Sequence, residues 1–158
     1  MKWEQKHRNI ITEIISMLFV VLFVYAAMGK LLDGNKFYNN LNNSPLFGVG
    51  HIAGIVSWAI PVIEIGVALL LTFQKTRLKG LYGALILMAT FTIYVAGILF
   101  ISPYTPCSCG GIITLLSWEQ HFIFNIIWIG LAITGIVLYR KECGATPHST
   151  YHYTKYPF

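Results

Sequence analysis

Cys107 and Cys109 are the residues of this chain that most directly predict a chemical function, because they are two thiols only two positions apart. They form a Cys-Ser-Cys tripeptide that follows two prolines and precedes Gly110 and Gly111. A disulfide between neighbours two positions apart closes a tight ring, and distorted geometry makes such a bond easier to reduce. Labile disulfides are the catalytic or regulatory ones, and the two glycines give an attacking thiolate room to approach. The motif therefore predicts thiol–disulfide exchange.

Three other roles of the two thiols stay open at this point. A permanent disulfide could stiffen the loop, although so short a ring removes little entropy from the unfolded chain. Two thiolates could hold a soft metal such as copper(I), but the loop offers no methionine and no further cysteine as an additional ligand, and we therefore predict no metal. The thiols could also be unpaired and without a role.

The elements that must position this loop are membrane-spanning helices. Hydrophobic residues make up 56% of the chain and charged residues 11%, whereas globular proteins have roughly 25% charged residues. Four apolar runs are long enough to cross a hydrocarbon core of about 30 Å, at residues 10–27, 52–73, 81–101 and 122–139. Backbone groups in lipid must be satisfied within their own segment, which favours helices over barrel strands.

We therefore predict an all-α integral membrane protein, a four-transmembrane-helix bundle over residues 1–141 followed by a polar, mobile tail at residues 142–158. One alternative concerns the first apolar run, which also has the features of a secretory signal cleaved near Ala26. Cleavage there would leave three spans and would not change the side of the membrane on which the cysteines lie.

The basic residues predict the orientation of the bundle. Of the 11 Lys and Arg residues, nine flank the runs on one side, whereas only Lys30 and Lys36 are on the other and the cysteine loop has none. Lys and Arg are enriched in cytoplasmic loops, so we expect both termini in the cytoplasm. Cys107 and Cys109 then face the oxidising periplasm, and Cys143 the reducing cytoplasm. This asymmetry and attraction to anionic lipids account for the net charge of +5, which gives no reason to predict nucleic-acid binding.

Several polar residues lie in or beside the predicted spans. Glu64 is near the middle of the second run, where an ionisable group is costly enough to suggest a proton or quinone site, or else a hydrogen bond between packed helices. Lys30, Asp33, His51 and His121 fall at the outer rim. A cation near a cysteine raises the thiolate fraction, and His51 and His121 are candidates for this role.

At these residues the chain resembles a known family. The stretch Gly29–Asp33, followed by Phe37, resembles the signature of DoxX proteins after their first helix, and Pro61–Gly66 resembles their second helix. The Cys107–Gly110 loop between the third and fourth runs is similar to the C-x-C loop of MauE, the methylamine utilisation protein. The resemblance extends over residues 10–138.

The resemblance implies a four-helix protein of the MauE/DoxX redox-associated group in the bacterial inner membrane. MauE is linked to maturation of the disulfide-rich small subunit of methylamine dehydrogenase, alongside a thioredoxin-like partner, and DoxX to a thiosulfate:quinone oxidoreductase. By this likeness, Cys107 and Cys109 would exchange disulfides with a periplasmic thioredoxin-like protein and support disulfide formation or maturation of exported proteins, with methylamine metabolism as the context.

The route of the electrons limits the mechanism. The chain holds three cysteines and no second pair in its spans or on its outer side, which excludes an internal thiol relay. A quinone near Glu64 is the candidate cofactor, and a second protein is the alternative. Two other functions stay open: a non-catalytic assembly subunit whose disulfide shapes a docking loop, and a DoxX-like subunit of a quinone oxidoreductase whose chemistry belongs to its partner.

Overall fold

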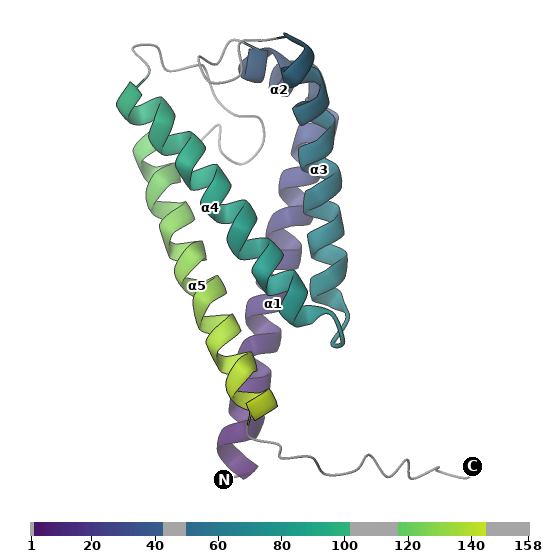
Figure 1. The fold of residues 1–158 in the computed structure, drawn as a ribbon, viewed down its shortest axis with the longest axis vertical. Coiled ribbons are helices and arrows are strands. Elements are labelled where there is room, and N and C mark those ends of the chain that lie inside the picture. The colour runs from purple at the N-terminus through teal and green to yellow at the C-terminus, as the bar shows by residue number, and fades with distance from the viewer. Residues whose placement is uncertain (1, 43–49, 102–116, 145–158) are drawn as a thin grey trace, which may run out of the picture.

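The structure, a computed structural model, describes residues 2–42, 50–101 and 117–144 of the chain. Within these ranges the chain is helical, with no strand, and the helices are α1 (Lys2–Leu32), α2 (Gly34–Asn42), α3 (Gly50–Thr72), α4 (Arg77–Ile101) and α5 (Trp118–Gly144) (Figure 1). Over the same ranges, four segments are long and apolar enough to cross a membrane, namely His7–Leu32, Ile52–Thr72, Arg77–Gly97 and Glu119–Lys141. The prediction of an all-α protein with four membrane-spanning helices is therefore confirmed.

The long helices run alternately up and down the bundle (Figure 1). The start of α1, the turn at residues 73–76 between α3 and α4, and the last turn of α5 lie at one end, which we call the turn end. Helix α2, the start of α3, the end of α4 and the start of α5 lie at the other, the α2 end. Most of the basic residues that the structure describes are at the turn end: Arg8, Lys75, Arg77, Lys79, Arg140 and Lys141.

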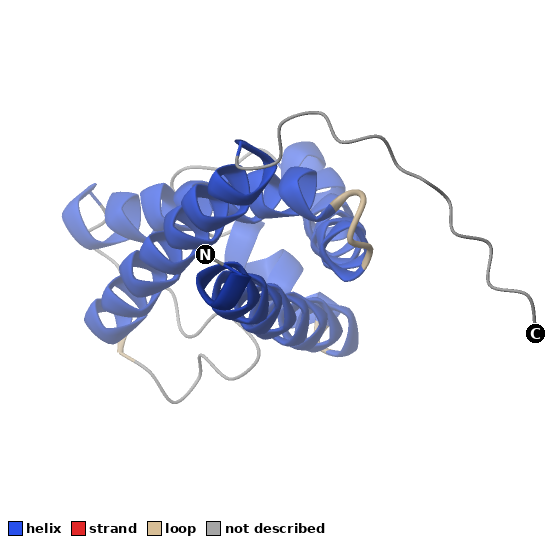
Figure 2. Cartoon of the chain, turned by 90° about the horizontal axis from the view of Figure 1, so that it is seen from below, coloured by secondary structure: helices blue, strands red, loops and turns tan. Residues whose placement is uncertain are grey.

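The four long helices form a ring in which each packs mainly against two others. Helix α1 contacts α3 and α5, and α4 contacts the same two helices, so that α1 and α4 are diagonal to each other. Figure 2 shows this arrangement along the bundle. The short helix α2 packs on α3, against which it buries Phe37 and Leu41 beside Ala53. Phe37 and Leu41 are four residues apart, so both lie on the face of α2 that packs on α3.

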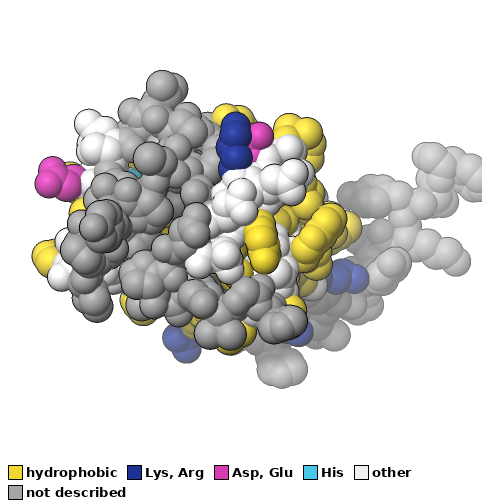
Figure 3. All heavy atoms as spheres, turned by 90° about the horizontal axis from the view of Figure 1, so that it is seen from above, with side chains coloured by type: hydrophobic (Ala, Val, Ile, Leu, Met, Phe, Trp, Pro, Cys, Tyr) yellow, Lys and Arg dark blue, Asp and Glu magenta, His cyan; other side chains and the backbone are white. Residues whose placement is uncertain are grey.

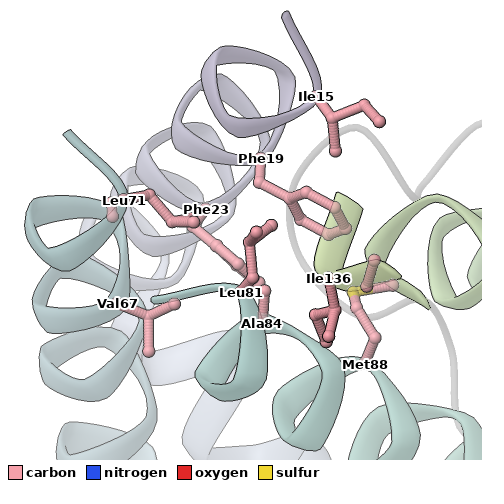
Figure 4. Close-up of a cluster of buried hydrophobic side chains, with 11 residues drawn as sticks. Ile15, Phe19, Phe23, Val67, Leu71, Leu81, Ala84, Met88 and Ile136 are labelled. Atoms are coloured by element: carbon pink, nitrogen blue, oxygen red, sulfur yellow. The ribbon is translucent and has the colours of Figure 1, made fainter. Parts of the chain in front are cut away.

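A hydrophobic core fills the bundle toward the turn end (Figure 4). Its buried members come from all four long helices: Ile15, Phe19, Phe23, Val67, Ala68, Leu71, Leu81, Ala84, Met88, Ala132 and Ile136. The ring of Phe19 on α1 meets that of Trp128 on α5 edge to face, with 4.9 Å between centroids. Because α1 supplies three of these side chains, it is an integral part of the bundle, which favours a membrane span over a cleaved signal for the first apolar run.

Gly80, near the start of α4, packs directly against the backbone of α3. A Cβ at this position would lie 2.8 Å from the backbone nitrogen of Leu71 and 2.9 Å from the Leu71 Cγ. The backbone of α3 cannot yield to such a contact as a flexible side chain would. Glycine at this position therefore permits the tight α3–α4 turn, which the hydroxyl of Thr76 also closes by donating to the Leu70 carbonyl oxygen at 2.8 Å.

We expect Gly80→Ala to lower the free energy of unfolding by about 1–3 kcal/mol, because the added methyl group overpacks a backbone contact. Gly130→Ala is the matched control, since nothing lies within 4 Å of a Cβ at Gly130. Alanine has the higher helix propensity, so the control should match or slightly exceed the wild type in stability. Thermal unfolding of both variants in detergent measures the difference, and equal midpoints would contradict the close approach at Gly80.

Candidate functional site

The predicted thiol pair lies outside the described residues. Cys107, Cys109, Gly110 and Gly111 belong to the segment that links the end of α4 to the start of α5. Both of these helix ends are at the α2 end of the bundle (Figure 1). Figure 3 looks onto this end, where apolar side chains border the basic and acidic ones. Among the described residues, those near these two helix ends are the ones that a site associated with the thiols would use.

The start of α5 is fixed by a reciprocal pair of hydrogen bonds. The Ser117 backbone N–H donates to the Gln120 Oε1 at 3.0 Å, and the Gln120 N–H donates to the Ser117 Oγ at 3.3 Å. This arrangement is a capping box, which satisfies backbone donors that the first helical turn would leave unpaired. It places His121 in the first turn of α5, and Asn125 lies four residues further on, on the same face of the helix.

An ion pair links α1 to α3 inside the bundle. The Lys30 Nζ, in the last turn of α1, lies 2.5 Å from the Glu64 Oε1 near the middle of α3. The Glu64 side chain is 0% exposed and that of Lys30 is 13% exposed. The Lys30 ammonium also lies 5.8 Å from the ring centroid of Phe37 and 5.1 Å from that of Phe91. A carboxylate at this depth requires a cation and hydrogen bonds to offset its lost hydration, and Lys30 provides both.

The ion pair lies at the wall of a cavity of about 140 Å³. Helices α3 and α4 diverge from their turn toward the α2 end (Figure 1), and all five helices contribute lining residues. Most of the wall is apolar, with Leu22, Phe23, Ile60 and Val95 among its side chains. Thr90 on α4 also lines the cavity and is itself exposed, so one wall reaches the outer, lipid-facing surface of the bundle.

Three buried polar atoms around this cavity have no hydrogen-bond partner among the described residues. They are the Glu64 Oε2, the His121 Nδ1 and the Asn125 Nδ2. His121 is 8% exposed and Asn125 is 2% exposed, so little of either residue is accessible to water as a hydrogen-bond partner. Buried polar groups are nearly always hydrogen-bonded, because leaving one unsatisfied costs about 1–3 kcal/mol. One carboxylate acceptor, one amide donor and one imidazole nitrogen thus remain available to a molecule in the cavity.

Three of the polar residues singled out in the sequence come together here, because Lys30, Glu64 and His121 all line the cavity. Asp33 does not. Its exposed carboxylate lies 3.5 Å from the Lys36 Nζ, and its carbonyl oxygen accepts the N–H groups at the start of α2. Asp33 therefore interacts with the start of α2 and not with the cavity residues. His51 is in the first turn of α3, and its side chain is outside the described part of the structure.

Asn125 was not predicted as a site residue. A neutral amide within an apolar run is a weaker signal than a charged residue, since it can be satisfied by one neighbouring carbonyl. Its spacing was informative, however, because residues four apart on a helix share one face, and His121 is four residues before it. The pair His121 and Asn125 on α5 could have indicated a polar face directed into the bundle.

Comparison with known protein families identifies the family of this chain. The family model described as methylamine utilisation protein MauE matches residues 8–138. Neither a comparison with curated proteins nor one with solved structures gives a match. The matched range covers all or nearly all of each of the four apolar helices, and it includes the cavity residues and the Cys107–Gly110 stretch of the sequence. It concerns MauE alone, so the likeness to DoxX stays a prediction. The chain therefore belongs to the MauE family of methylamine utilisation proteins and is a multi-pass membrane protein.

Proposed function

We propose that this chain is a thiol–disulfide oxidoreductase of the bacterial inner membrane. Cys107 and Cys109 face the periplasm and exchange a disulfide with a thioredoxin-like protein, in support of disulfide formation in exported proteins. The observation that carries the proposal is the position of the C-x-C motif. It lies in the connection between α4 and α5, whose anchoring ends are at the opposite end of the bundle from most of the basic residues.

The orientation follows from the same distribution of charge. Cytoplasmic loops carry an excess of Lys and Arg, so the turn end is cytoplasmic and the α2 end is periplasmic. Both termini are then cytoplasmic, with residues 1–141 forming the membrane domain and residues 142–158 a polar tail. Disulfides form and persist in the periplasm, where the pair meets exported proteins.

The exchange conserves atoms and electrons in two steps. A thiolate of the reduced partner attacks one sulfur of the Cys107–Cys109 disulfide, forms a mixed disulfide and releases the other cysteine as a thiolate. The second thiol of the partner then attacks the mixed disulfide. The partner leaves oxidised, and Cys107 and Cys109 remain as a dithiol that has gained two electrons and two protons. Another two-electron acceptor must restore their disulfide, because the chain has only three cysteines and Cys143 is at the turn end.

We expect Cys107→Ser to trap the partner as a stable mixed disulfide with Cys109. In this variant the Cys109 thiolate attacks the disulfide of the oxidised partner, and without Cys107 the mixed disulfide cannot resolve into a Cys107–Cys109 disulfide and a reduced partner. The measurement is a covalent band of higher mass in membranes quenched with an alkylating agent, which dithiothreitol removes. The control is Cys107→Ser combined with Cys109→Ser, which keeps Cys143 and should give no such band. A pair that is fully oxidised in the wild type and traps nothing in the variant would favour the assembly role over exchange.

A further inference from the structure

The lining of the cavity limits the kind of molecule that it can hold. Its volume of about 140 Å³ is close to that of cavities of roughly 150 Å³ that bind a single benzene ring. Apolar side chains such as Phe23, Ile60 and Val95 make up most of the wall. The space therefore suits one ring with an apolar body, and one wall reaches the lipid-facing surface beside Thr90.

The polar groups limit the charge of that molecule. Lys30 and Glu64 neutralise each other at 2.5 Å, so the cavity offers no net charge to attract an ion. The amide of Asn125 and the ammonium of Lys30 are hydrogen-bond donors, the free Glu64 Oε2 is an acceptor, and the His121 Nδ1 is either, according to its tautomer. A lipid acyl chain would leave the Glu64 Oε2, the His121 Nδ1 and the Asn125 Nδ2 without a hydrogen-bond partner. A neutral ring that bears oxygen atoms able to accept and donate hydrogen bonds satisfies them.

A membrane quinone has this chemistry in both of its redox forms. In the oxidised form its carbonyl oxygens accept hydrogen bonds, for which Asn125 and Lys30 are suitable donors. In the reduced form its hydroxyl groups donate, for which the Glu64 Oε2 is a suitable acceptor. The same cavity can thus hold substrate and product of a two-electron reduction.

We propose that Lys30, Glu64, His121 and Asn125 bind the head group of a membrane quinone, which accepts electrons from the Cys107/Cys109 dithiol. The reaction needs no further reactant, because one dithiol and one quinone give one disulfide and one quinol. Two electrons and two protons leave the sulfurs and reach the quinone. The binding of quinone stands on the cavity alone, whereas the transfer of electrons rests on the proposed function.

The test uses the full-length protein in lipid nanodiscs with two single-ring quinone probes, ubiquinone-1 and duroquinone. Trp128 reports binding through quenching of its fluorescence, since its ring lies 5.7 Å from that of the cavity residue Phe124. We expect saturable quenching in the wild type by at least one probe, and about tenfold weaker binding in Asn125→Leu, which keeps the size of the side chain but removes its hydrogen bonds. Thr134→Val is the control, because Thr134 is exposed on the same helix and its hydroxyl donates to the Gly130 carbonyl oxygen, away from the cavity residues.

A second variant and a second measurement separate this inference from the proposed function. Glu64→Gln keeps the shape of the side chain and should also weaken binding, while Thr134→Val should not. Added quinone should oxidise the reduced Cys107/Cys109 pair in the wild type, and about tenfold more slowly in Asn125→Leu. Equal binding by wild type, Asn125→Leu and Glu64→Gln would overturn the quinone site while leaving the trapping experiment unaffected. Quinone binding without oxidation of the thiols would overturn the electron transfer.

Discussion

Replacing Lys30 by methionine is expected to lower the free energy of unfolding by about 3–5 kcal/mol, the range found when one partner of a buried ion pair is removed. Methionine has a similar length, so little packing is lost. The carboxylate of Glu64, however, is 0% exposed and would lose the cation that lies 2.5 Å from it. The Lys30 ammonium also contacts the rings of Phe37 and Phe91, and those contacts would be lost too. Thermal unfolding in detergent, followed by tryptophan fluorescence, measures the effect.

Two controls make this prediction specific. Lys36→Met removes a lysine whose partner Asp33 is exposed, and pairs of that kind contribute at most about 1 kcal/mol. The double variant Lys30→Met/Glu64→Met replaces the buried pair by apolar groups of similar size, which is often neutral, so it should recover most of the stability lost in Lys30→Met. If Lys30→Met is as mild as Lys36→Met, or if the double variant is worse than either single one, the ion pair does not have the role described.

A bulky impermeant maleimide is expected to label Cys107 and Cys109 from outside intact, reduced spheroplasts and to leave Cys143 unlabelled until the cells are opened. Cys143 is in the last turn of α5, whereas Cys107 and Cys109 precede the first residue of this helix in the sequence. The 27 residues of α5 span about 40 Å at 1.5 Å per residue. That length exceeds the roughly 30 Å hydrocarbon core. The difference is all or none, because a reagent that cannot cross the membrane reaches one end of the helix only.

Single-cysteine variants provide the controls for this labelling. A chain that keeps Cys109 alone should react in intact spheroplasts, and a chain that keeps Cys143 alone should react only after lysis. The reverse pattern would place the C-x-C motif in the reducing cytoplasm, where stable disulfides are rare, and would remove the basis of the proposed exchange. Labelling of neither group in intact cells would do the same.

The membrane spans could be predicted from the sequence because the bilayer itself imposes their length and composition. The ends of the helices could not be predicted from apolar content. Helix α4 begins at Arg77, before the apolar run that starts at Leu81, because the turn is closed by hydrogen bonds of Thr76. Helix α5 begins at Trp118 because of the capping box between Ser117 and Gln120, which is a polar signal rather than an apolar one.

The charged residues of the candidate site could be predicted from the sequence, but the ion pair between them could not. Glu64 stood out because a carboxylate in an apolar run is costly, and Lys30 because it is one of few basic residues on its side. They are 34 positions apart in the chain, so only the packing of α1 on α3 could show that they meet. Asn125 went unnoticed because a neutral side chain gives no such signal by itself.

The contact between the Lys30 ammonium and the Glu64 carboxylate also has a consequence for how this protein can evolve. A lineage that lost only one of the two residues would pass through an intermediate with an uncompensated charge in its interior, which selection for a folded protein would remove. Both positions can change together, or neither changes. Their histories are therefore coupled, and homologues are expected to hold either both charges or an apolar pair in their place.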